Sequence, residues 1–168
     1  MPDSPFAGER LIAGIEGGRA PFTVNFTANQ DNYPQPVITT GAEGIWITTP
    51  AITFKASRAY RITVKGLLAP TATGSEGQVR VRKGALGGQL LFDSFRMTVP
   101  ATGNYAFLFG NIITNSTGAA ITAPIVGTVA RSSGTANFTV NGSAVSPSYL
   151  HVEDVGPASD FNGSTSLS

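Results

Sequence analysis

Residues 60–65, Tyr60-Arg61-Ile62-Thr63-Val64-Lys65, alternate apolar and polar side chains with a period of two. Successive side chains of a β-strand point to opposite faces, so this period predicts a strand with one buried face and one solvent-exposed face. Residues 78–83, Gln78-Val79-Arg80-Val81-Arg82-Lys83, repeat the pattern. Two such segments indicate that sheets, rather than helices, build the core of this protein.

Six further segments are rich in the β-branched and aromatic residues that strands favour. They span residues 45–54, 89–99, 104–114, 125–131, 136–141 and 149–155. Clusters of turn-forming residues separate them, and no segment beyond residue 44 has a convincing helical period. About eight strands without crossover helices predict an all-β protein, an antiparallel β-sandwich. A jelly roll fits the strand count best, and an immunoglobulin-like sandwich is the alternative.

We expect the chain to have three parts. Residues 1–43 contain several prolines and glycines and little periodicity, which predicts an extended N-terminal arm; an arm folded back on its own domain is the alternative. Residues 44–157 contain the predicted strands and form the β-sandwich domain. Residues 158–168 are small and polar, which predicts a flexible C-terminal tail.

The composition argues against two classes of partner. Eleven basic and ten acidic residues give the 168-residue chain a net charge of +1, so it has no global basic surplus for a nucleic acid. No apolar run reaches the roughly 18 residues that span a bilayer, and the start, MPDSPFAGER, lacks the features of a signal peptide. We therefore expect no nucleic-acid or membrane partner. We also expect a protein made in the cytoplasm and not exported by a signal of its own.

The sequence offers few residues for catalysis or metal binding. It has no cysteine and a single histidine, His151, whereas a zinc site needs several such ligands. Serines are plentiful, but the Gly-x-Ser-x-Gly motif of one common hydrolase class is absent. The acidic residues are scattered, apart from the adjacent pair Glu153-Asp154, so a calcium loop is disfavoured. We expect a protein that is not an enzyme, with no catalytic residue, no metal and no cofactor.

The single histidine lies in the segment PSYLHVEDVGP, residues 147–157. The alternation of a strand directs Leu150 and Val152 to one face. It directs Tyr149, His151 and Glu153 to the other. We interpret these three side chains as part of a surface or subunit contact rather than as a catalytic group.

Basic residues gather in the middle of the chain. Seven of the eleven lie between Lys55 and Lys83, where the only acidic residue is Glu76. If the two alternating strands pair as neighbours, one exposed face carries Arg61, Lys65, Arg80 and Arg82. One hypothesis is a binding patch for an acidic protein surface or a polyanion. The favoured alternative is a solvated sheet face whose charges prevent aggregation.

Two aromatic residues are candidates for stacking on a sugar. They are Trp46 and Tyr33, although Trp46 also fits a core or interface position within Ile45-Trp46-Ile47. A glycosidase would need two carboxylates facing each other across a cleft, and the sequence offers none at a recognisable spacing.

Three motifs carry a resemblance to a known group of proteins. They are Phe54-x-x-x-Arg58-x-Tyr60-Arg61-Ile62, Gly77-x-Val79-Arg80-Val81-Arg82-Lys83-Gly84 and Pro147-x-Tyr149-Leu150-x-Val152-Glu153-Asp154-Val155-Gly156. Over residues 44–157 the chain resembles small β-sandwich virion surface proteins, of the minor tail or head decoration type, from tailed phages infecting actinobacteria. The resemblance implies a β-sandwich with a structural role in the virion. It brings no catalytic residues with it.

The expected function is therefore that of a structural protein of a tailed-phage virion. The favoured role is a capsid decoration (cement) protein on the outer surface of the particle, present as a homotrimer. The alternative is a minor tail protein or a tail-tip or fibre component that binds host-surface carbohydrate. The expected partners are other copies of the chain and other virion proteins, such as the major capsid or tail proteins. The expected location is the virion, after synthesis in the host cytoplasm.

Overall fold

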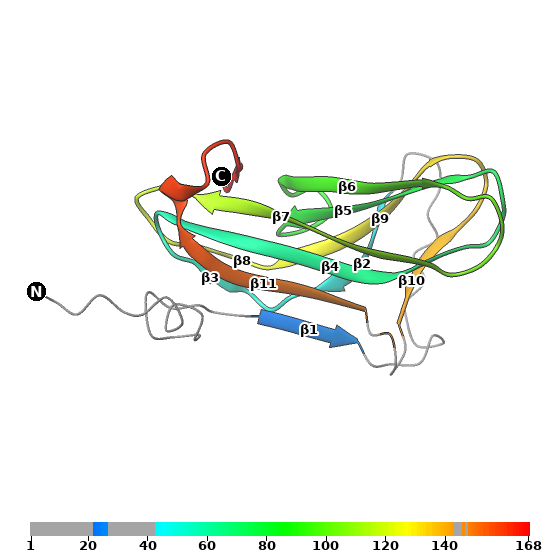
Figure 1. The fold of residues 1–168 in the computed structure, drawn as a ribbon, viewed down its shortest axis with the longest axis horizontal. Helices are drawn as coiled ribbons and strands as arrows, with labels where there is room; N and C mark the ends of the chain where they lie inside the picture. Colours follow the sequence, from blue (N-terminus) through cyan, green and yellow to red (C-terminus); the bar gives the residue numbers. More distant parts are fainter. Residues whose placement is uncertain (1–21, 27–42, 143–145, 147) are drawn as a thin grey trace, which may run out of the picture.

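The protein consists of two β-sheets packed face to face, in a computed structural model that describes residues 22–26, 43–142, 146 and 148–168. Sheet A contains, in spatial order, β1 (Phe22–Phe26), β11 (Ser148–Pro157), β4 (Arg58–Pro70), β7 (Tyr105–Asn115) and β12 (Thr165–Ser166), with β10 (Phe138–Asn141) also paired to β4. Sheet B contains β2 (Glu43–Thr48), β9 (Ile125–Ser133), β5 (Glu76–Lys83) and β6 (Leu90–Thr98). A two-stranded sheet is formed by β3 (Ile52–Phe54) and β8 (Ile121–Ala123). Figure 1 shows β5 and β6 at the top of the view and β11 and β1 at the bottom.

The strand order is that of a jelly roll. Sheet A runs β1-β11-β4-β7 and sheet B runs β2-β9-β5-β6, and every neighbouring pair in these two runs is antiparallel. Consecutive strands repeatedly pass from one sheet to the other, as the double Greek key of a jelly roll requires. The predicted all-β antiparallel sandwich is thus confirmed, with the jelly roll as its topology.

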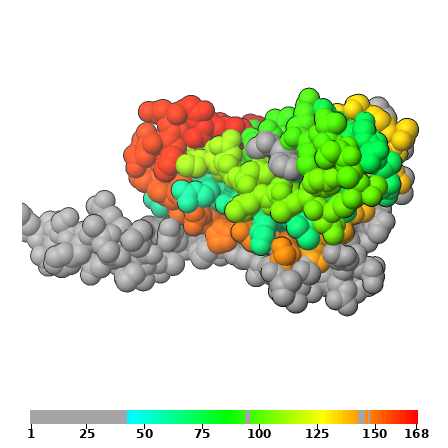
Figure 2. Space-filling model, turned by 45° about the vertical axis from the view of Figure 1, so that its right-hand side comes forward, coloured from blue at the N-terminus to red at the C-terminus, as the bar shows by residue number. Residues whose placement is uncertain are grey.

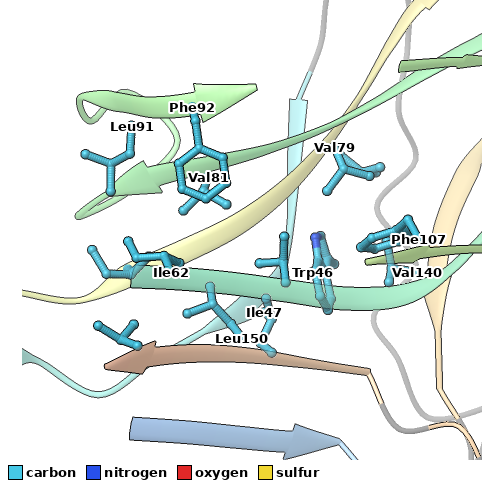
Figure 3. Close-up of a cluster of buried hydrophobic side chains, with 14 of the residues drawn as sticks. Trp46, Ile47, Ile62, Val79, Val81, Leu91, Phe92, Phe107, Val140 and Leu150 are labelled. Carbon is cyan, nitrogen blue, oxygen red and sulfur yellow. The ribbon is translucent and has the colours of Figure 1, made fainter. Parts of the chain in front are cut away.

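The core lies between the two sheets and follows from the alternating pattern. Ile62 and Val64 of β4 are fully buried, and they face Val79 and Val81 of β5, which are also fully buried. Figure 3 shows Val79 and Val81 on one side and Ile62 on the other side of the space between the strands. Gly127 lets β9 approach β2 closely, because a Cβ atom there would lie 2.5 Å from the Cγ2 atom of Ile47.

The sequence located the long strands and missed the short ones. Segment 45–54 is two strands, β2 and β3, rather than one. The strands β8 and β12 have three and two residues, too few for a period to be visible. The other predicted segments each overlap one strand of the structure, including the four-residue β10.

One strand falls inside the expected N-terminal arm. Strand β1 pairs antiparallel with β11, with Phe22 opposite Val152 and Phe26 opposite Ser148. Residues 22–26 therefore belong to the sandwich, and the expected boundary at residue 44 does not hold for them. Their sequence, Phe-Thr-Val-Asn-Phe, alternates apolar and polar residues, so it carried a short strand signal. The rest of residues 1–42 lies outside the described residues.

The C-terminal segment differs from the expected flexible tail. After a short 3₁₀ turn, Ala158–Asp160, the strand β12 pairs parallel with β7, and Leu167 is only 1% exposed. The side chain of Gln89 donates to the carbonyl oxygen of Ser166 at 2.6 Å and accepts from the backbone N–H of Ser168 at 3.0 Å. One buried leucine and these hydrogen bonds attach a segment that is otherwise small and polar.

Candidate functional site

The four basic residues expected on one surface lie on two different sheets. Arg61 and Lys65 belong to β4 in sheet A, whereas Arg80 and Arg82 belong to β5 in sheet B. The expected shared face does not form, because the connection between β4 and β5 crosses from one sheet to the other. The molecule therefore has two distinct outer surfaces, the sheet A face and the sheet B face.

The sheet A face is formed by the outward side chains of β11, β4 and β7. The strand registers place them in three rows: Tyr149, Lys65 and Leu108; His151, Thr63 and Gly110; Glu153, Arg61 and Ile112. The intervening residues Leu150 and Val152 are fully buried, which confirms the predicted alternation along β11. Five of the eight residues predicted to make contacts therefore lie together on this face.

The charged groups of the sheet A face make weak contacts with one another. Arg61 Nη1 lies 3.0 Å from Glu153 Oε1, and His151 Nε2 lies 3.9 Å from Glu153 Oε2. Lys65 Nζ lies 6.0 Å from the centre of the Tyr149 ring. The side chain of Arg61 is 54% exposed, and ion pairs of this kind contribute about 0–1 kcal/mol. A partner can therefore replace these contacts at little cost to the fold.

A shallow depression of about 550 Å³ lies within this face. It is lined by Arg61, Thr63, Leu108, Phe109, Gly110, Asn111, Ile112 and Tyr149. Leu108, one of these lining residues, is 63% exposed, the most exposed of the large hydrophobic side chains that the structure describes. In Figure 2 the yellow-green residues, which include β7, spread over the front of the molecule. The surface thus combines apolar, aromatic and charged groups.

The sheet B face is a closed network centred on Glu43. Its carboxylate accepts hydrogen bonds from Arg82 Nε at 2.9 Å and Nη2 at 2.7 Å, from Arg80 Nη1 at 3.2 Å, and from the Thr128 hydroxyl. Arg80 Nη2 also donates to Gln78 Oε1 at 2.6 Å. Sequence reasoning missed Glu43, which comes from β2 and is distant in sequence from both arginines.

The charges of this network reinforce one another. Burial alone would raise the pKa of Glu43, but hydrogen bonds from Arg82 and Thr128, with the charges of both arginines, lower it below its usual value. The hydrogen bond to Glu43 in turn raises the pKa of Arg82. Both arginines are thus held in a network of hydrogen bonds, and their role in a contact with a partner stays a hypothesis.

A second ion pair lies on the inner side of sheet A. Arg58 Nη2 and Nε donate to the carboxylate of Asp154 at 2.6 and 3.0 Å, and the side chain of Asp154 is 1% exposed. This hydrogen bonding raises the pKa of Arg58. Because Asp154 points inward and Glu153 outward, the one adjacent acidic pair of the sequence does not form a common ligand site.

The structure does not support Trp46 as a residue that stacks on a sugar. This residue is 4% exposed and packs edge-on against Phe107, with ring centres 6.1 Å apart. Trp46 is therefore a core residue, the alternative that the sequence left open. Tyr33 lies outside the described residues.

The described residues contain no group of three His, Cys, Asp or Glu side chains that could hold a metal ion. Within the same residues, no helix has the length and apolar character needed to cross a membrane. His151 lies beside Glu153 on the outer face of sheet A.

Comparison with known proteins gives similarity in fold only. No protein family matches the chain, and no curated protein matches its sequence. A solved structure of T=1 particles derived from infectious bursal virus matches 83% of this chain and 37% of that chain, with 10% identity and a TM-score of 0.50. The VP2 subviral particle of infectious bursal disease virus matches 82% of this chain and 38% of that chain, with 15% identity and a TM-score of 0.46. The chain thus spans little more than a third of the length of these proteins.

Proposed function

We propose that the protein is a non-enzymatic structural component of a virus particle. The observation that carries this proposal is the jelly-roll strand order of the chain. The likeness in fold to the protein of the bursal virus T=1 particles supports it. A face of weakly paired charges around an exposed leucine suits contact with a protein surface.

Within this class, the favoured role is a decoration protein on the outer capsid surface of a tailed phage that infects actinobacteria. The support is the resemblance over residues 44–157, and the role implies contact with the major capsid protein and assembly as a homotrimer. The second candidate is a minor tail protein or a tail-tip or fibre component that binds host carbohydrate. The depression next to the Tyr149 ring favours this second role, because aromatic rings stack on sugar faces.

Mass spectrometry of separated heads and tails tests the location. The experiment uses purified particles of the phage that encodes the chain. Peptides of the chain in the head fraction support decoration, and peptides in the tail fraction support the second candidate. Absence from both fractions would overturn the virion assignment.

A binding experiment tests whether the sheet A face contacts the capsid. Purified protein is mixed with heads that lack it, and bound protein is measured after sedimentation. Lys65→Glu reverses a charge on the sheet A face, and Lys55→Glu makes the same change at an exposed residue outside the three rows. We expect Lys65→Glu to bind less than both the wild type and Lys55→Glu. Equal binding of the two variants would argue against this face.

A further inference from the structure

The outer edge of β7 is long, regular and largely without a strand partner among the described residues. Its ladder with β4 runs from Tyr105 to Asn115 without a register shift. On the opposite edge, β12 pairs only with Ile113 and Thr114. A sheet edge of this kind is a template for another strand, unless charges, proline or a bulge protect it.

The other sheet edges are protected or short. Strand β2 carries Glu43 and an irregular register between Ile45 and Ile47. Strand β6 carries Asp93 and Arg96, and its pairing with β5 shifts register twice. Strand β1 has five residues. The eleven residues of β7, by contrast, contain no charge and no proline.

The hydrogen bonds of β12 show which backbone groups of β7 point to this edge. The N–H of Leu167 donates to the carbonyl oxygen of Thr114 at 2.8 Å, so Thr114 directs its backbone polar groups outward. Backbone groups alternate along a regular antiparallel strand, so Ile112, Gly110, Leu108 and Ala106 point the same way. The N–H of Ile112 donates to the side-chain oxygen of Asn111 at 2.9 Å, which closes that end.

We propose that β7 pairs antiparallel with β7 of a second copy of this chain, about a twofold axis at Leu108. The outward groups of Ala106, Leu108 and Gly110 define the register. Leu108 then lies opposite the Leu108 residue of the second copy, and Ala106 lies opposite Gly110. Sheet A becomes one continuous sheet across the two copies.

The chemistry of the edge favours a second copy over a different partner. An interface about a twofold axis must be self-complementary, so a charge near the axis would face itself. The eleven residues of β7 carry none. The exposed Leu108 would pack against the same apolar leucine of the second copy. The small residues Ala106 and Gly110 leave room for this pair of leucines. This contact goes beyond the proposed trimer, because a threefold ring needs a different surface.

The absence of cysteine makes a direct test of the register possible. Residues opposite each other in a hydrogen-bonded antiparallel pair have Cα atoms about 5.5 Å apart, within the range that a disulfide bridges. We expect Leu108→Cys to form a covalent dimer on mild oxidation at low protein concentration. Leu86→Cys is the matched control, because Leu86 is an exposed leucine, 41% accessible, in the turn between β5 and β6. Cross-linking of Leu108→Cys no faster than Leu86→Cys would overturn the proposed register.

Sedimentation equilibrium of variants without cysteine tests the contact itself. A lysine at an edge strand opposes pairing, so we expect Leu108→Lys to halve the wild-type mass, whether the wild type is a dimer or a larger assembly. Leu86→Lys should keep the wild-type mass, and thermal melts verify that both variants are folded. A wild type that is monomeric at about 100 µM, or an unchanged mass for Leu108→Lys, would exclude the contact. Neither result bears on the head and tail fractions, so the virion proposal stands or falls separately.

Discussion

The two outer faces of the sandwich use the same residue types in opposite ways. On the sheet B face, Arg80 and Arg82 share the carboxylate of Glu43, and their side chains are 26% and 16% exposed. On the sheet A face, Arg61 pairs with Glu153 and its side chain is 54% exposed. An outward arginine of an alternating strand therefore lies either in a structural hydrogen-bond network or on an open surface. The carboxylates that reach it decide between them.

This difference indicates which face would oppose a partner least. A partner on the sheet B face would have to break several charge-assisted hydrogen bonds, each about twice as strong as a neutral one. A partner on the sheet A face displaces weak contacts, such as the ion pair of the 54% exposed Arg61 with Glu153, beside a shallow depression. The sheet A face is thus the surface on which an interaction is least opposed by the fold.

The largest expected effect tests the orientation of β11, on which the sheet A face depends. Leu150→Asp places a charge in the core and should cost at least about 4 kcal/mol or unfold the domain. His151→Ala, one residue along, should change the free energy of unfolding by about 0.5 kcal/mol or less. Thermal and denaturant melts of the two variants measure this. A silent Leu150→Asp with an unfolded His151→Ala would mean that the strand is inside out.

The next effect compares the two faces directly. Glu43→Ala leaves two partly buried arginines without their carboxylate and should lower the free energy of unfolding by about 2–3 kcal/mol. Glu153→Ala removes the equivalent carboxylate of the sheet A face and should cost about 0–1 kcal/mol. Urea denaturation provides both values. Similar costs for the two variants would remove the distinction between the faces.

The pH dependence of stability should reveal the contribution of Glu43 on the sheet B face. The folded-state pKa of Glu43 is lowered, so its contribution to stability is complete above the unfolded value of 4.5. As the pH falls below 4.5, the unfolded chain binds the proton first, and the contribution is lost through the folded pKa. We expect Glu43→Gln to weaken the pH dependence of stability below 4.5. An unchanged acid limb in melts at several pH values would show that Glu43 does not contribute to it.

The smallest effect concerns the open ion pair. Arg61→Ala should change the free energy of unfolding by less than about 1 kcal/mol at low salt. The difference from the wild type should shrink further at high salt, because exposed charges are screened. Melts at two ionic strengths measure both. A larger cost that persists at high salt would place Arg61 in a network like that of Glu43.

The sequence predicted what depends on local alternation and missed what depends on topology. The period along β4, β5 and β11 placed Val64, Val81 and Leu150 in the core, and all three are fully buried. The same period is found in a strand of either sheet, so it did not show that β4 and β5 separate. Their connection is held by residues that flank other strands: the N–H of Thr71 donates to the carbonyl oxygen of Asn137, just before β10, and that of Gly74 to Val99, just after β6.

The candidate site was predicted in part for the same reason. Neighbours along one strand, Tyr149, His151 and Glu153, lie on one face as expected, although their role as a contact stays a prediction. The Glu43 network was missed, because its members come from strands that are adjacent only in the folded sheet. Glu43 is the single charged residue of β2, and nothing in the sequence around it predicts that it binds two arginines of β5.

The pairing of β1 with β11 also has a consequence for how the chain folds. The first described strand has its hydrogen-bonding partner in the last long strand, with Thr23 opposite His151. During synthesis, at about 5–20 residues per second, β1 must wait several seconds before β11 exists. Sandwiches dominated by such distant pairings fold in milliseconds to seconds, far more slowly than helical bundles. The apolar residues of the early strands are therefore exposed to aggregation during that interval, and closure of the sandwich is among the last events of folding.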